Sequence, residues 1–260
     1  MNTLNLAVKK KVSTRNIIAI LIWPLLLLLY AFQPLWEIAL TPFATEGKAL
    51  LYEQSSLLSL FLNHIFIVAT TVILIILVAL PLAIYVTHPS GEKFLALVRN
   101  ITTMSQTLPP MAVLFLFLPL MGFGTKVVIF SMFLYGILPT LQAAITGLSS
   151  VNDQTLDVAK GIGLSPRQTL FKVELPLALP AILAGLRTSI LLIIATTALS
   201  PMVGAESLGS PIIVGFSINS TSQILQGAVA VALLSLVTNF SLRSLEEHLT
   251  QWRDGASSSH

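Results

Sequence analysis

Long apolar runs constrain this sequence more than any other feature. Residues 71–86 read TVILIILVALPLAIYV, without a single charged side chain. A helix of about 20 apolar residues crosses the hydrocarbon core of a bilayer. We therefore predict an all-α fold, a polytopic membrane protein that forms a single domain over residues 1–260. The six predicted transmembrane helices cover residues 17–40, 63–86, 102–121, 127–145, 178–203 and 224–242.

Composition excludes several other classes of protein. Hydrophobic residues make up 55% of the chain and charged residues 10%, whereas a soluble domain carries about 25% charged residues. The chain has no cysteine, which excludes disulfides, thiolate metal sites and cysteine nucleophiles. Its four histidines are scattered, without the spacing of metal ligands. The net charge of +3 is not gathered on one basic face, which argues against nucleic-acid binding.

The positions of lysine and arginine predict the orientation in the membrane. If the N-terminus is cytoplasmic, eleven of these residues lie inside and two, Lys48 and Lys126, lie outside. Because basic residues accumulate on the cytoplasmic side, we expect both termini there. Lys9 to Arg15 before the first apolar run would also suit a signal peptide, but no convincing small-residue cleavage site follows.

A polar insert, which we call the knob (residues 150–176), interrupts the apolar runs on the cytoplasmic side. Ser150 followed by Asp153 resembles a capping box and predicts the start of a short helix. Gly161 and Gly163 predict its end, because glycine tolerates the left-handed backbone of a helix stop.

A second helix is predicted to begin at once. Ser165 suits the N-cap position, Pro166 the first helical position, and Gln168 the third. The Glu-Leu-Pro run at 174–176 predicts its end. The knob is thus expected to be a rigid helix–turn–helix that docks on another protein.

The knob resembles the coupling loop of permease subunits of ATP-binding-cassette importers, in the binding-protein-dependent (MetI-like) superfamily. That motif reads Glu-Ala-Ala, three residues, Gly, nine residues, Ile, one residue, Leu-Pro. The corresponding residues are Asp157-Val158-Ala159, Gly163, Val173 and Leu175-Pro176, with three conservative substitutions. The resemblance implies docking on a cytoplasmic ATPase subunit. The residues expected to serve this coupling are Asp157, Ala159, Lys160, Gly161, Gly163, Leu164, Leu175 and Pro176.

The stretches 106–125, 133–151, 173–190 and 207–240 look like permeases of the quaternary-amine uptake family. This resemblance implies an importer of osmoprotectants such as glycine betaine, choline or carnitine. There are two departures from the family pattern. The usual Gly-Ala-Gly-Gly-Leu-Gly segment reads GAESLG from residue 204, and Asn239 stands where an acid is common.

The resemblance also implies the rest of the assembly. The outer loops are about twenty residues long, too short for a folded receptor, and no phosphate-binding loop is present. An extracytoplasmic solute-binding protein would therefore capture the solute, and ATP with its magnesium would bind the ATPase subunits. A second permease, identical or homologous, would complete the path in a bacterial-type inner membrane. No cofactor is expected on this chain.

Polar residues within or beside the predicted spans are candidates for the translocation path. Gln106 and Thr107 precede two prolines, where a broken helix could expose backbone carbonyls or simply kink. Thr197 and Ser200 could line the path or let helices pack closely. Glu206 could attract a trimethylammonium group or contact the receptor.

Two polar residues are expected to be structural. Arg187, inside the fifth predicted span, should anchor that helix near the cytoplasmic face by pairing or snorkelling. Asn239 should bridge helices.

Three other functions are alternatives to this one. An intramembrane enzyme would need a nucleophile elbow, a zinc-binding His-Glu-x-x-His or paired aspartates, and the sequence has none of them. A free-standing secondary transporter would leave the knob unexplained and should show an internal repeat. A permease for another small solute, such as an amino acid or an oxyanion, stays open.

Overall fold

The computed structural model describes residues 14–105 and 109–250, and the regular structure within these ranges is helical. Three short 3₁₀ turns lie at Thr41–Phe43, Glu92–Phe94 and Ser200–Val203, and a π-helical turn at Leu170–Glu174. The helices are α1 (Thr14–Ala31), α2 (Gln33–Leu40), α3 (Leu57–Thr87), α4 (Leu95–Ser105), α5 (Pro110–Met121), α6 (Thr125–Ser149), α7 (Asp153–Gly161), α8 (Pro166–Thr169), α9 (Leu175–Thr197), α10 (Ser210–Ser217) and α11 (Thr221–Thr250).

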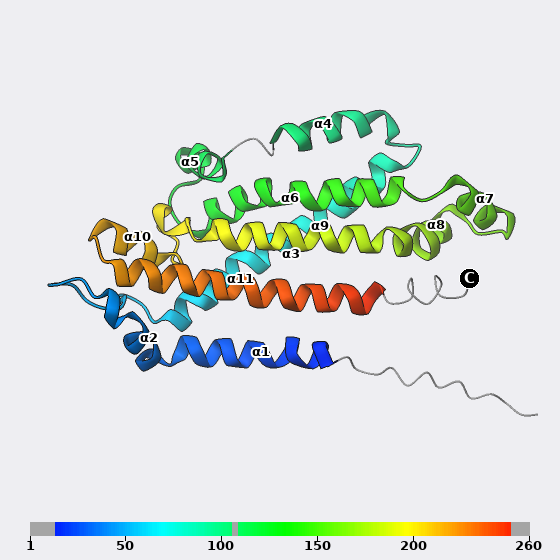
Figure 1. Ribbon diagram of the computed structural model, residues 1–260. Helices are drawn as coiled ribbons and strands as arrows, with labels where there is room; N and C mark the ends of the chain where they lie inside the picture. The colour runs from blue at the N-terminus through cyan, green and yellow to red at the C-terminus, as the bar shows by residue number, and fades with distance from the viewer. Residues whose placement is uncertain (1–13, 106–108, 251–260) are drawn as a thin grey trace, which may run out of the picture.

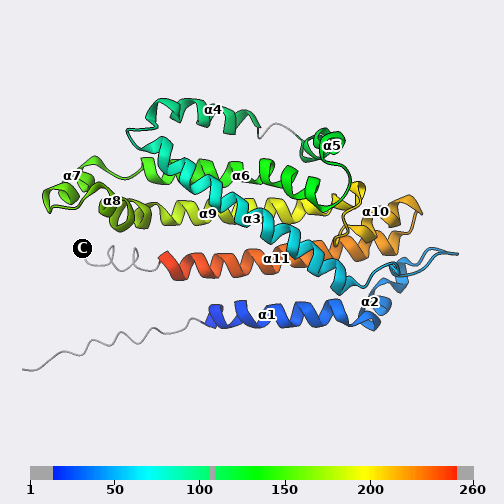
Figure 2. The ribbon, with the colours of Figure 1, turned by 180° about the vertical axis from the view of Figure 1, so that it is seen from behind.

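The long helices form an elongated bundle with α6 and α9 side by side at its centre (Figure 1). Helix α3 crosses these two diagonally, as the view from behind shows (Figure 2). Small residues allow the close approach: a Cβ atom at Gly185 on α9 would lie 2.3 Å from the Cβ of Ala143 on α6. Close backbone contact at small residues is typical of helices packed in a membrane.

The described chain supplies four helices that are long and apolar enough to cross a membrane. These are α3, α6, the continuous helix 166–197 and α11. The segments 15–31 and 33–43 meet the same test only when taken together, and they are bent by 73° relative to each other. The prediction of a helical membrane protein is thereby confirmed, whereas the number of six spans is not confirmed by these helices.

The first predicted span, 17–40, is not one straight helix. Helix α1 ends at Ala31, and α2 begins at Gln33 with Pro34 in its first turn. A proline ring has no N–H to donate and clashes with the carbonyl four residues earlier. The sharp bend at Phe32 follows from this clash.

The predicted span 102–121 is not one continuous helix, and the disruption that the sequence allowed beside Pro109 and Pro110 is present. Helix α4 ends at Ser105, and Pro109 has an extended backbone before Pro110 opens α5. A residue that precedes a proline is pushed out of the helical region, and here that residue is itself a proline. Helix α5 has 12 residues and is therefore about 18 Å long, well short of a hydrocarbon core of about 30 Å.

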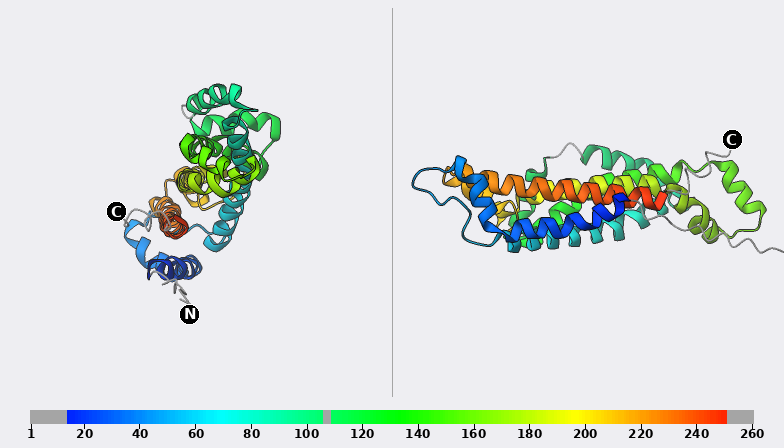
Figure 3. Two further views of the ribbon diagram at one scale, coloured as in Figure 1. Left: turned by 90° about the vertical axis from the view of Figure 1, so that its right-hand side faces the viewer. Right: turned by 60° about the horizontal axis from the view of Figure 1, so that its bottom comes forward.

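The two ends of the described chain lie at the same end of the bundle. Figure 1 shows the start of α1, the end of α11 and helix α7 together on the right, with α2 and α10 on the left. Seen from the α7 end, α1 and α4 lie at opposite edges of the bundle (Figure 3, left), and α7 and α8 project beyond its main body (Figure 3, right).

Candidate functional site

The first helix of the knob, α7, has Asn152 rather than Ser150 as its N-cap. The Asn152 side chain accepts a hydrogen bond from the Gln154 N–H at 2.9 Å, and Asp153 stands in the first turn of α7. Ser150 instead closes α6, with its hydroxyl donating to the Gly147 carbonyl at 2.8 Å. The predicted capping box at Ser150 was therefore wrong: Asn152 is the N-cap, because asparagine caps helices as well as serine does and stands directly before α7.

The predicted glycine stop is confirmed at Gly163. Its φ is +85°, in the region that disfavours side chains. Its N–H bonds to the Lys160 carbonyl at 2.9 Å, and the Leu164 N–H bonds to the Ala159 carbonyl at 3.1 Å. These two bonds form a Schellman motif, which satisfies the last carbonyls of α7. Gly161, by contrast, is an ordinary helical residue.

The predicted second helix start is also confirmed. The Gln168 N–H donates to the Ser165 hydroxyl at 3.4 Å, and the Ser165 N–H donates to the Gln168 side-chain oxygen at 2.9 Å. Pro166 occupies the first turn, so its missing N–H leaves no bond unmade. The capping box fixes Ser165 as the residue at which the chain leaves the turn of the knob and enters α8.

The prediction that this second helix ends at 174–176 was wrong. Helix α8 continues through the π-helical turn into α9, giving one helix of 32 residues from Pro166 to Thr197. In the π-helical turn the Leu175 N–H bonds to the Leu170 carbonyl, five residues back. This wider turn precedes Pro176 and relieves its clash with the carbonyl four residues earlier. The second helix of the knob, α8, and the membrane-length helix α9 therefore form one continuous helix.

The predicted coupling residues divide into two groups. Those that are exposed on the knob are Asp157, Lys160, Gly161 and Gly163, whereas Ala159 is buried and Leu164, Leu175 and Pro176 are partly buried. Asp157 and Lys160 form an exposed ion pair at 3.4 Å, which adds little to stability.

The knob also exposes large apolar side chains that the sequence reasoning missed. Val158 is 65% exposed, Ile162 72% and Phe171 57%. Exposed apolar side chains beside charged ones are typical of a docking surface. The signal was present in the sequence, since Val158 and Ile162 stand four residues apart on a short helix whose other residues are mostly polar.

A groove runs along one face of α6, bordered by α9. One part of this groove is a cavity of about 650 Å³. Its polar lining residues are Tyr135, Gln142 and Thr146 on α6 and Thr188 on α9. These α6 residues recur at the spacing of one helical face. A lining of mixed polar and small side chains on helices of membrane length is unusual for a face that meets lipid.

The groove continues between α6 and α4. A second cavity of about 420 Å³ shares Gln142 and Thr146 with the first and adds Arg99, Thr103 and Ser149. The Arg99 guanidinium donates to the Ser149 hydroxyl at 3.2 Å. We call the two cavities together the α6 groove; it leads from the middle of the bundle toward the knob end.

The predicted path residues that the structure describes, Thr197, Ser200 and Glu206, do not line the α6 groove. Gln106 and Thr107 fall outside the described residues. Thr197 and Ser200 are buried where α9 ends, and the Ser200 hydroxyl donates to the Ala205 carbonyl at 2.8 Å. Glu206 is exposed at the opposite end from the knob, where it accepts a hydrogen bond from the Ser55 hydroxyl at 3.0 Å. Their assignment to a path stays a prediction.

The charge of Glu206 also affects a neighbour. Burial, together with this carboxylate, raises the pKa of the Tyr52 phenol. Tyr52 belongs to a loop that is tied to α11, because its N–H donates to the Gln226 side chain at 2.9 Å.

His64 on α3 was not singled out from the sequence, yet it closes the end of α9. The side chain is fully buried, and its Nε2 lies 3.1 Å from the Ile194 carbonyl oxygen. The N–H of Ala198, which would take this carbonyl in a longer helix, bonds to Thr196 instead. The imidazole therefore satisfies a carbonyl that the helix end leaves free.

Comparison with known proteins shows which family this chain resembles. Residues 76–254 match the protein family described as binding-protein-dependent transport system inner membrane component. The chain is 37% identical over 206 residues to the choline transport system permease protein OpuBB of Bacillus subtilis, covering 79% of this chain and 91% of that protein. It is 34% identical to the glycine betaine/carnitine/choline transport system permease protein OpuCB of the same organism, with the same coverage.

Two further comparisons agree. The osmoprotectant import permease protein OsmY of Salmonella typhimurium is 34% identical over 213 residues, which cover 82% of this chain and 86% of that protein. Among solved structures, a chain of the MetNI methionine ABC transporter in an inward facing conformation superposes with a TM-score of 0.66. That alignment has 17% identity and covers 76% of this chain and all of the other, so it shows a shared fold.

Proposed function

This chain belongs to the family of binding-protein-dependent transport system inner membrane components, and we propose that it is the permease subunit of an ATP-driven importer of osmoprotectants. The knob carries this proposal. It is a short helix and a Schellman turn set on the end of a helix that is long enough to cross the membrane. A chain that only had to remain in the bilayer would have no use for it.

The proposed solutes are quaternary amines such as glycine betaine, carnitine or choline. The support is the set of relatives, which are named as permeases for choline, for glycine betaine, carnitine and choline, and for osmoprotectants. An aromatic ring can attract a quaternary ammonium group through its π face. Tyr135 in the α6 groove offers such a ring along the proposed path.

The α6 groove is the proposed translocation surface of this subunit. It is open on one side, so a second permease, identical or homologous, would close it into a path. Among the described residues that line it, Arg99 is the one charged side chain. A zwitterionic betaine has no net charge and can therefore pass a surface that offers hydroxyls and an amide.

Coupling follows from the continuity of the helix that begins at Pro166. The knob would sit on a cytoplasmic ATPase, with Asp157, Lys160, Gly161 and Gly163 at the contact and Leu164 as an apolar anchor. Closure of the ATPase dimer would then move the knob. Helix α9 would move with it, because α8 of the knob and α9 belong to one continuous helix. The bundle would open its path alternately to a loaded solute-binding protein outside and to the cytoplasm.

We propose six crossings and a cytoplasmic knob. Helix α3 ends at the knob end of the bundle and α6 starts at the other end (Figure 1), so the chain between them must traverse the bundle. The segment α4–α5 would make this crossing as a broken helix, which is tolerated where the irregular backbone is covered by protein. Orientation rests on the lysines and arginines, which are concentrated on the knob side.

Uptake by cells that depend on this system tests the function. Cells that lack other osmoprotectant importers should accumulate radiolabelled glycine betaine, carnitine or choline at high osmolarity only when this permease is expressed. Accumulation of methionine or of an oxyanion instead would refute the solute class and leave the permease assignment intact. Unchanged uptake of every solute on the panel would refute both.

A further inference from the structure

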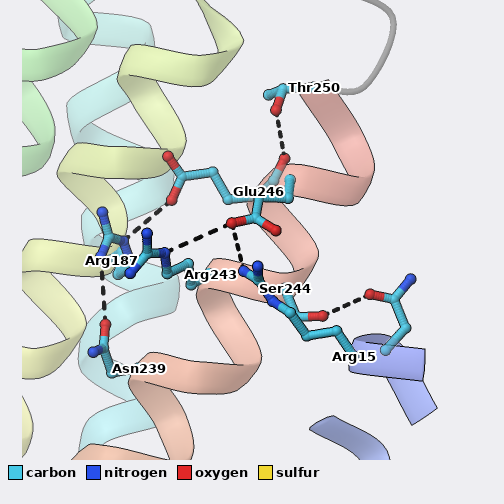
Figure 4. A network of polar contacts seen from close by, with 9 residues as sticks. Arg15, Arg187, Asn239, Arg243, Ser244, Glu246 and Thr250 are labelled. Atoms are coloured by element: carbon cyan, nitrogen blue, oxygen red, sulfur yellow. Dashed lines mark hydrogen bonds and ion pairs between the residues drawn. The ribbon is translucent and has the colours of Figure 1, made fainter. Parts of the chain in front are cut away.

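Three guanidinium groups meet two carboxylates where α1, α9 and α11 come together at the knob end of the bundle (Figure 4). The Arg187 Nε lies 3.1 Å from a Glu246 oxygen, and its Nη1 donates to Asn239 at 3.4 Å. Arg187 and Asn239 thus join α9 to α11, as the sequence predicted. Glu246 is 21% exposed, so this inner pair is largely shielded.

The outer part of the cluster has more positive than negative charge. The Arg15 Nη2 lies 2.5 Å from a Glu247 oxygen, and the Arg243 Nε lies 3.6 Å from the same oxygen. One carboxylate therefore serves two guanidinium groups. The side chains of Arg15 and Arg243 are 37% and 66% exposed, which leaves N–H donors free to hold an anion. A guanidinium matches the geometry of a phosphate through paired hydrogen bonds.

A pocket of about 500 Å³ lies beside these arginines, in the seam between α1 and α11. Asn16, Ser244 and His248 line it, and they are the chain neighbours of Arg15, Arg243 and Glu247. Deeper along the seam α1 contributes the apolar residues Ala19, Ile20 and Trp23, whereas α11 contributes Leu245 beside Ser244 and then Ser241. The α1 wall of the pocket thus changes from polar to apolar along the helix axis, whereas the α11 wall stays mixed.

The surroundings of the seam favour a lipid over a soluble anion. The outward face of α1 exposes Ile17, Ile18 and Leu21, side chains that suit contact with acyl chains. Hydrogen bonds hold α1 and α11 together at both ends of the pocket, from the Ser244 hydroxyl to Asn16 at 2.6 Å and from the Trp23 Nε1 to the Ser241 hydroxyl at 2.9 Å. An amphiphile could therefore lie along the seam without entering the bundle.

We propose that this end of the α1–α11 seam is a binding site for an anionic phospholipid. Arg15 and Arg243 hold the phosphate headgroup at the membrane surface, and one acyl chain lies along Ile20 and Leu245. Basic pockets between membrane helices bind anionic lipid headgroups by the same combination of charge and depth. The site is separate from the α6 groove and does not depend on the solute that is transported.

Native mass spectrometry of the purified full chain tests the site, with phosphatidylglycerol and phosphatidylcholine titrated in turn. The wild-type protein should retain phosphatidylglycerol in preference. The double variant Arg15→Gln/Arg243→Gln should reduce that preference roughly tenfold or more, since the phosphate would lose both guanidinium partners. Lys126→Gln, at the other end of the bundle, is the matched control and should leave it unchanged.

Glu247→Gln keeps the test independent of folding defects. Removing the carboxylate that occupies both guanidinium groups should strengthen phosphatidylglycerol binding, an effect that a misfolded variant would not show. Equal retention of the two lipids, or a preference that survives the double substitution, would overturn the proposal. Displacement of the lipid by inorganic phosphate at similar concentration would overturn the lipid assignment in favour of a free anion.

Discussion

At the scale of single residues, the turn of the knob depends on Gly163. Its φ of +85° is disfavoured for a side chain by about 1–2 kcal/mol, and a β-branched residue adds to this cost. A Cβ atom at this position would meet nothing within 4 Å, so the strain comes from the backbone alone. Gly163→Val should leave membrane abundance normal, reduce ATPase co-purification about tenfold and abolish solute uptake.

Gly161, in the same proposed contact, provides a comparison that separates added side-chain volume from a strained backbone. It lies two residues earlier, is helical, and also has free space around its Cβ position. Gly161→Ala should stabilise α7 by about 0.5–1 kcal/mol, because alanine loses less entropy in a helix. Normal uptake by Gly163→Val at normal abundance would show that this turn does not couple the two subunits.

His64 gives a second prediction at this scale. His64→Leu leaves the Ile194 carbonyl buried without the imidazole donor, which should cost about 1–3 kcal/mol of unfolding free energy. His64→Gln can still donate from its amide and should cost less. Thermal unfolding of the three proteins in one detergent measures this, and equal midpoints for all three would rule out a capping role.

At the scale of elements, the helix from Pro166 to Thr197 transmits motion only if it is rigid. Two glycines inserted between Glu174 and Leu175 would each cost about 1 kcal/mol of helix stability and would break the rod beside the π-helical turn. The capping box and the Schellman turn lie outside the insertion. We therefore expect ATPase co-purification to persist while uptake falls to background. Uptake at the wild-type rate would show that motion is not transmitted from the knob through this helix.

The elements that could be predicted from the sequence are those fixed by local hydrogen bonds. The positive φ of Gly163 and the capping box at Ser165 both depend on residues within five positions of each other, so short-range reasoning found them. Pro176 was misread as a helix end, because proline often terminates helices and nothing local shows that a π-helical turn accommodates it. The α6 groove depends on how α4, α6 and α9 pack against one another. The spacing of residues along the sequence does not reveal this packing, so the groove could not be predicted.

At the scale of the whole molecule, hydropathy found the membrane helices but not their breaks. A run of apolar residues reports the surroundings of a segment, whereas Pro34 and Pro109 decide its path. The segment α4–α5 shows the difference most clearly, since α5 is an apolar helix although the backbone before it leaves the helical conformation at Pro109. Whether it crosses the bilayer decides between six and five passes.

Single cysteines can resolve this topology, because the natural sequence contains none. We would place them at the exposed positions Glu46, Lys93, Phe123 and Gln154, one in each variant. A maleimide that cannot cross the membrane should label the Glu46→Cys and Phe123→Cys proteins in right-side-out spheroplasts, because both sites lie at the end of the bundle opposite the knob. Lys93→Cys and Gln154→Cys should react only after lysis, as the proposed orientation places them in the cytoplasm.

Phe123 is the decisive position in this set. It lies between α5 and α6 and is 76% exposed, so its reactivity reports the side on which α4–α5 ends. Labelling from outside requires that the broken helix cross the bilayer, and it brings α6 back to the cytoplasmic side where the knob can meet an ATPase. Labelling of Phe123→Cys only after lysis would reduce the passes to five and reverse α6, whereas external labelling of Gln154→Cys would remove the knob from the cytoplasm and with it the coupling mechanism.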